Sequence, residues 1–106
     1  MKKCRSYKEY ITGSLKDPKE ASAHLKACLE EALENDEMSI FQLAVRDVVD
    51  AQGGIAKIAS MMNVGRESFY KSMSSKGKPR FVTIMQALKA CGLEVVFHPL
   101  RLKKSA

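Results

Sequence analysis

Apolar residues recur at helical spacing along most of the chain, with polar residues filling the positions between them. This spacing gathers the apolar side chains on one face of successive helices, so we predict an all-α bundle of five to six helices. The apolar positions that recur in this way are Tyr7, Tyr10, Ile11 and Leu15; Ala21, Leu25, Cys28, Leu29, Ala32 and Leu33; Phe41, Ala44, Val45, Val48 and Val49; and Phe81, Ile84, Met85, Leu88 and Cys91.

Capping and breaking residues mark where these helices begin and end. Asp17 and Pro18 are typical of an N-cap followed by proline at the first helical position, and Glu20 lies where a capping box would place it. Gly53-Gly54 is expected to end the third helix, and Gly92 to end the last one, which we place at about residues 81–91.

One short segment has the alternation of a β-strand instead. Leu93, Val95 and Phe97 occupy alternate positions, which predicts a strand over Leu93–Phe97 that Pro99 ends. A lone strand leaves its backbone hydrogen-bonding groups without partners. We therefore expect it to pair with the same strand of a second copy across a two-fold axis, through Leu93, Val95 and Phe97, or to pack on its own helices.

Between the third helix and the last one, the sequence predicts a helix-turn-helix. Two short helices, about Ile55–Met62 and Arg66–Ser74, are joined by a three-residue turn. Ala59 supplies a small side chain where the helices approach most closely. Asn63 lies where the backbone often needs a positive φ, which asparagine tolerates well among non-glycine residues, and Gly65 is placed to cap the second helix.

The second helix of this hairpin is expected to have an inner and an outer face. The inner face of the second helix is expected to carry Phe69, Ser72 and Met73. We expect Ile58 and Met62 of the first helix to pack against Val64 and Phe69. The outer face carries Arg66, Glu67, Tyr70 and Lys71, where the major groove of DNA would lie. Helical hairpins with an alanine and a tight turn are common, so an ordinary structural hairpin remains the alternative.

The outer face has the chemistry of base recognition. Arg66 can offer two parallel hydrogen bonds to guanine, and Glu67 can accept one from a cytosine amino group or simply hold Arg66 in place. Lys71 and Tyr70 can reach bases or phosphates, and the cations of the following loop suit phosphates. The DNA-binding residues that we predict are Lys57, Arg66, Glu67, Ser68, Tyr70, Lys71, Lys76, Lys78 and Arg80.

Charge supports this assignment because it is unevenly distributed. The 106-residue chain has a net charge of +6. Residues 53–80 hold six basic residues against one acidic, a net charge of +5, whereas residues 17–37 hold seven acidic residues against two basic, a net charge of −5. Such asymmetry suggests one half that faces a polyanion and a separate acidic face.

Several motifs resemble one known family. They are Gly53-Gly54-Ile55-Ala56-Lys57-Ile58-Ala59, Gly65-Arg66-Glu67-Ser68-Phe69-Tyr70-Lys71, Gly77-Lys78-Pro79, the opening Tyr7-Lys8-Glu9-Tyr10 and Leu15-Lys16-Asp17-Pro18, and the closing Leu88-Lys89-Ala90-Cys91-Gly92-Leu93. Together they resemble the probable addiction-module antidote family, HigA-like antitoxins with a Cro/C1-type helix-turn-helix, over about Tyr7 to Phe97. At two positions the chain departs from the family: Asn63 stands where the family often has glycine, and Gly65 stands where a polar capping residue is common. We expect the motif to tolerate both departures.

The resemblance implies a function and two partners. Such proteins neutralise a small basic RelE/HigB-like toxin and repress their shared operon by binding its double-stranded DNA operator. Glu30, Glu31 and Glu34 are the candidate toxin-binding residues, and the alternative is that they form an ordinary solvated helix face. The predicted strand is an alternative toxin site, by strand addition. A homodimer suits a palindromic operator.

Other classes of function find less support in the sequence. The chain has three widely spaced cysteines, Cys4, Cys28 and Cys91, and this odd number argues against a disulfide framework. We expect neither His24 nor His98 at ligand spacing from a cysteine, so we predict no metal site and no cofactor. No phosphate-binding glycine loop or nucleophile motif is present, so we expect no enzyme. The basic N-terminus is not followed by an apolar run, so we expect a cytoplasmic protein without a signal peptide.

We therefore predict a single helix-turn-helix domain over residues 1–106. It comprises N-terminal helices (1–52), the DNA-binding hairpin and basic loop (53–80), a closing helix and strand (81–98) and a flexible tail (99–106). The predicted function is a DNA-binding antitoxin and autorepressor. The alternatives are a stand-alone phage- or plasmid-type repressor and a protein-interaction module that does not bind DNA.

Overall fold

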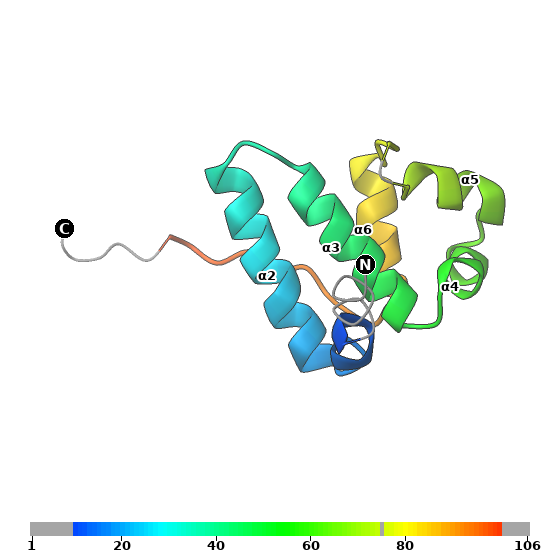
Figure 1. Ribbon diagram of the computed structural model, residues 1–106, viewed down its shortest axis with the longest axis horizontal. Coiled ribbons are helices and arrows are strands. Elements are labelled where there is room, and N and C mark those ends of the chain that lie inside the picture. The colour runs from blue at the N-terminus through cyan, green and yellow to red at the C-terminus, as the bar shows by residue number, and fades with distance from the viewer. Residues whose placement is uncertain (1–9, 75, 101–106) are drawn as a thin grey trace.

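The computed structural model describes residues 10–74 and 76–100, and within them it is helical with no β-strand (Figure 1). Residues 10–14 are helical and precede five further helices. These are α2 (Pro18–Glu34), α3 (Ser39–Ala51), α4 (Ile55–Met62), α5 (Arg66–Ser72) and α6 (Phe81–Ala90). The predicted all-α bundle is therefore confirmed, while the predicted strand is wrong.

The start of α2 follows from the two residues that the sequence singles out. Asp17 has an extended backbone, and its carboxylate accepts a hydrogen bond of 2.9 Å from the Lys19 N–H, which would otherwise lack a helical partner. Pro18, which has no N–H to satisfy, takes the first helical position. The predicted N-cap is confirmed, and it fixes where α2 begins relative to the preceding helix.

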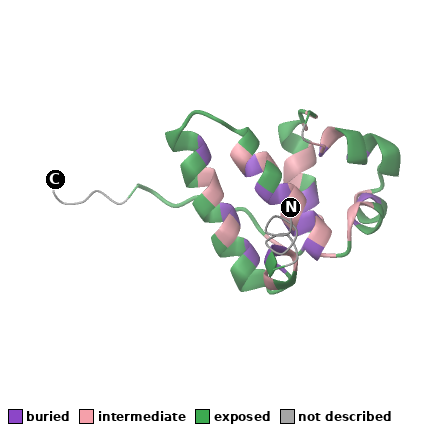
Figure 2. Cartoon of the chain, viewed as in Figure 1, coloured by how far each residue is buried: buried purple, intermediate pink, exposed green. Residues whose placement is uncertain are grey.

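Helix α3 lies at the centre of the bundle. Its buried residues include Ala44, Val45, Val48 and Val49, and the last three have no exposed surface. The helix packs most extensively against α2 and also contacts α4 and α6 (Figures 1 and 2). Because the buried side chains of the other helices gather around this face, α3 sets the positions of both the N-terminal helices and the hairpin.

Three residues that were expected on apolar stripes are exposed instead. Tyr10 is 70% exposed, although Ile11 beside it is buried. Leu33 is 67% exposed, because it lies roughly 100° around the helix from the buried Ala32 and so falls off the stripe. Phe81 is 73% exposed. It is the first residue of α6, and side chains point toward the N-terminus of their helix, so its ring projects past the end of the core.

The segment after α6 is extended but forms no strand. The Leu93 N–H donates to the Leu88 carbonyl at 3.0 Å, and Gly92 has a φ of +86°, so these residues close the end of α6 instead of beginning a strand. The part of the chain that the structure describes offers no second strand with which residues 93–97 can pair. Val95 is half-exposed and Phe97 is 89% exposed, and their role in a dimer stays a prediction.

The two described cysteines are protonated packing groups at neutral pH. Burial raises the pKa of the Cys91 thiol to about 11. Burial also raises the pKa of Cys28, and the nearby Glu31 and Asp47 carboxylates add to the shift. The expectation about His24 is wrong, because one helical turn brings its Nε2 atom to 3.8 Å from the Cys28 Sγ atom. Residues 10–74 and 76–100 nevertheless hold no group of three or more metal-ligating side chains.

None of the helices in the described part of the chain is long and apolar enough to cross a membrane.

Candidate nucleic-acid interface

The hairpin of α4 and α5 turns at Asn63. Asn63 has a φ of 61° and a ψ of 43°, the left-handed conformation that the sequence predicts for it. This conformation reverses the chain, and the Val64 N–H then donates back to the Ala59 carbonyl at 3.0 Å, which closes α4. Gly65 follows with an extended backbone and its carbonyl accepts the Phe69 N–H at 3.0 Å, so α5 begins directly after the turn.

Small and apolar side chains hold the two helices together. Ile58, Ala59 and Phe69 are each at most 3% exposed, and α4 packs against both α5 and α6. Ala59 thus lies buried in the hairpin, as predicted from its size. Val64 differs from the expectation, since its side chain remains 41% exposed in the turn, while its backbone N–H bonds to the Ala59 carbonyl.

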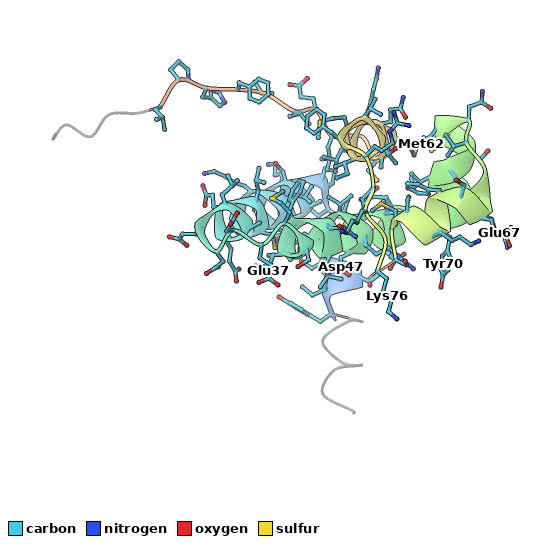
Figure 3. The ribbon with its side chains drawn as sticks, turned by 90° about the horizontal axis from the view of Figure 1, so that it is seen from above. Glu37, Asp47, Met62, Glu67, Tyr70 and Lys76 are labelled. Atoms are coloured by element: carbon cyan, nitrogen blue, oxygen red, sulfur yellow. The ribbon has the colours of Figure 1, made fainter. Side chains whose placement is uncertain are left out.

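The outward face of α5 is available for contact with another molecule. Arg66, Glu67, Ser68, Tyr70 and Lys71 are all exposed, whereas Phe69 and Met73 are buried. Helix α5 lies at the end of the molecule that is farthest from α2, and Glu67 points outward from it (Figures 1 and 3). The structure therefore brings five of the nine predicted DNA-binding residues together on one short helix.

The other four predicted cations flank this helix. Lys57 is exposed on α4, and Lys76, Lys78 and Arg80 are exposed on the loop between α5 and α6. Figure 3 shows that Lys76 and Tyr70 point to the same side of the molecule. The exposed cations of the hairpin and the loop have the charge that suits contacts with phosphates.

A glutamine of α3 holds the basic loop in place. The Gln42 side-chain amide donates to the Gly77 carbonyl at 2.7 Å and to the Ser74 carbonyl at 3.3 Å. The Gly77 N–H donates to the Ser74 carbonyl at 2.9 Å. Gly77 lies so close to α5 that a Cβ atom there would collide with the carbonyl oxygens of Lys71 and Ser72.

A second α3 side chain contacts α5 directly. The Arg46 guanidinium lies 5.3 Å from the centroid of the Tyr70 ring, and its Nη1 atom donates to the Met73 carbonyl at 3.4 Å. Its Nε atom lies 3.2 Å from Asp50 Oδ1 in a half-buried ion pair. Gln42 and Arg46 are not identified from the sequence as supports of the candidate site. The only signal in the sequence is that Gln42, Arg46 and Asp50 are spaced four residues apart, which places them on one polar stripe of α3.

The acidic face lies on the opposite side of α3. Glu30, Glu31 and Glu34 are exposed along α2, and Glu30 lies 4.0 Å from Lys26 in a pair whose side chains are 68% and 79% exposed. Figures 1 and 3 both show α2 and α5 at opposite ends of the molecule. The predicted partner-binding residues therefore share a helix face that is separate from the basic surface.

Comparisons with known proteins identify the family. A family model described as "Probable addiction module antidote protein" matches residues 9–99. A Haemophilus influenzae protein described as "Uncharacterized protein" is 33% identical over 66 residues, which are 62% of this chain and 67% of that relative. No solved structure matches the chain. The chain therefore belongs to the family of probable addiction module antidote proteins, which implies a toxin as its partner.

The position of Gly77 gives a test of how the loop is docked. We expect Gly77→Ala to lower the free energy of unfolding by about 1–3 kcal/mol, because the added methyl group must displace the backbone of α5. Gly13→Ala is the matched control, since a Cβ atom at Gly13 meets nothing within 4 Å. We expect this helical substitution to leave stability unchanged or to raise it by up to about 1 kcal/mol. Urea denaturation measures both, and equal stability of the two variants would contradict the docked loop.

Proposed function

We propose that this chain is the antitoxin of a toxin–antitoxin module and that it represses its own operon by binding double-stranded DNA. The observation that carries the proposal is the exposed face of α5, where Arg66, Tyr70 and Lys71 project from a hairpin in a protein of the antidote family. Its activities are binding activities and require no catalytic residue or cofactor. Both partners are expected in the cytoplasm.

In the proposed complex, α5 enters the major groove of the operator. Arg66 stands at the first position of α5, where a recognition helix contacts base edges, and a bidentate pair with guanine discriminates by ~1–3 kcal/mol. Lys57, Lys76 and Lys78 contact phosphates on either side and position the helix without reading sequence. The hairpin acts as a helix-turn-helix of the Cro/C1 type in this proposal.

The proposal includes a homodimer, because a two-fold protein suits a palindromic operator. The support in the structure is the extended segment after α6, in which Val95 and Phe97 expose apolar side chains that no other described residue covers. Two chains per operator duplex are expected in solution.

The proposed toxin is a small basic protein of the RelE/HigB-like class, and α2 is its proposed docking helix. Glu30, Glu31 and Glu34 would provide charges complementary to such a protein. Because α2 and α5 lie at opposite ends of the molecule, the toxin and the operator would occupy different surfaces (Figure 1).

The DNA-binding part of the proposal predicts sequence-specific and salt-dependent affinity. We expect the protein to bind the duplex upstream of its own gene more tightly than random DNA, and Arg66→Ala to weaken that binding about tenfold or more. Fluorescence anisotropy at two salt concentrations measures this effect. Lys26→Ala, which removes an exposed cation from α2, is the control and should bind as the wild type does.

If the upstream duplex binds no better than random DNA, sequence-specific repression is wrong, and a protein-interaction role takes its place. If the protein binds its operator as a symmetric dimer but no toxin-sized gene lies beside its own gene, a stand-alone repressor would be favoured.

The toxin-binding part of the proposal predicts a loss on charge reversal. We expect the combined Glu30→Lys, Glu31→Lys and Glu34→Lys variant to bind the neighbouring gene's toxin about tenfold or more weakly, because a basic partner then meets like charges. Isothermal titration calorimetry measures this, with Glu67→Lys as a control that reverses an exposed charge on α5, away from α2 and from residues 93–97. Unchanged affinity of the triple variant would show that this face is only a solvated helix exterior.

A further inference from the structure

A polar stripe of α3 faces the DNA-reading helix. Gln42, Arg46 and Asp50 follow one another at intervals of one helical turn, on the side of α3 that meets the end of α5 and the basic loop. Three backbone carbonyls in this region, those of Met73, Ser74 and Gly77, accept hydrogen bonds from Gln42 or Arg46. The stripe therefore links the central helix to the hairpin by polar contacts in addition to apolar packing.

Arg46 has its hydrogen-bonding groups directed into the protein. Its Nε atom is paired with Asp50 at 3.2 Å, its Nη1 atom donates to the Met73 carbonyl, and its guanidinium lies over the Tyr70 ring. Its side chain is only 25% exposed, as is that of Asp50. By contrast, the cations of the loop, Lys76, Lys78 and Arg80, are exposed, which suits phosphate contacts. Arg46 thus differs in its surroundings from the nine predicted DNA-binding residues.

The two contacts of Arg46 with α5 restrain different parts of that helix. The cation–π distance of 5.3 Å is within the range of about 6 Å in which such contacts attract, so the Tyr70 ring is held on one side of α5. The bond to Met73 fixes the last turn, where a cation also interacts favourably with the helix dipole. Tyr70 is left 51% exposed, so its ring is oriented while its outer part stays accessible.

We propose that Arg46 is a positioning residue for DNA reading: it orients Tyr70 and the end of α5 and so contributes to discrimination between operator and random DNA. This inference rests on the proposed function. Base readout needs side chains held to within about 0.5 Å, whereas flexible lysines bind phosphates over a wider range of geometries. Loss of Arg46 therefore weakens specific binding and leaves electrostatic binding nearly unchanged.

Anisotropy titrations of Arg46→Gln against the upstream duplex and random DNA test the inference. We expect affinity for the upstream duplex to fall roughly five- to tenfold, affinity for random DNA to change less than about twofold, and the salt dependence to stay the same. Arg46→Lys keeps the cation but not the planar fork, so it should recover part of the loss. Lys26→Gln, which removes the cation of another four-residue ion pair on α2, should match the wild type.

A double-mutant cycle shows whether Arg46 acts through Tyr70. We expect Tyr70→Leu to lower the affinity for the upstream duplex, and Arg46→Gln to add little further loss in that background. The inference would be overturned if Arg46→Gln lowered the affinity for the upstream duplex and for random DNA equally and made the affinity less dependent on salt, because Arg46 would then be a phosphate contact. Unchanged discrimination, or fully additive losses, would also overturn it.

Hydrogen exchange without DNA separates this inference from the proposed function. We expect amides of α5 to exchange faster in Arg46→Gln than in the wild type, while those of α2 keep their rates. If the wild-type protein fails to discriminate between DNAs, the proposed function is wrong, and unchanged exchange in α5 separately overturns the positioning role of Arg46. The Arg46→Lys variant gives the same comparison should Arg46→Gln fail to fold.

Discussion

The burial of one face of α3 is the constraint on which the rest of the structure depends. Val45, Val48 and Val49 have no exposed surface, and the helix contacts α2 on one side and α4 and α6 on the other. Close packing of this kind transmits displacements, because a buried core has few voids to absorb them. The position of α3 therefore fixes how far the acidic helix lies from the basic hairpin.

The same helix serves the candidate interface through its polar side. Gln42 holds the basic loop by the Gly77 carbonyl, and Arg46 contacts Tyr70 and the end of α5. A seven-residue helix such as α5 is too short to be stable in isolation. Its order comes from buried Phe69 and Met73 beneath it and from these polar contacts beside it.

Much of the fold follows from local sequence signals, and the differences have physical causes. The observed ends of α4, the buried face of α3 and the left-handed Asn63 agree with the sequence, because each depends on residues close together in the chain. The strand prediction is wrong because alternation alone does not form a strand without a partner strand. Leu33 and Phe81 are exposed because periodicity does not show where the core ends.

For the candidate site, the sequence predicts which residues face outward from α5 but not what supports them. The outward positions follow from helical periodicity around buried Phe69, a local property. The hydrogen bonds from Gln42 and Arg46 to the Met73, Ser74 and Gly77 carbonyls join residues that are 27 to 35 positions apart in the chain, and only the folded structure brings them together. The four-residue spacing of Gln42, Arg46 and Asp50 indicates a polar stripe on α3, but it does not show which distant residues the stripe contacts.

The central claim is that the α4–α5 hairpin and its basic loop form the DNA-binding surface of an antitoxin. Chemical-shift perturbation of the isotope-labelled protein by the duplex upstream of its gene tests this claim most directly. The account predicts that the largest shifts fall on residues 57–80, with little change along α2. Shifts concentrated on α2, or the same small shifts with random DNA, would contradict it.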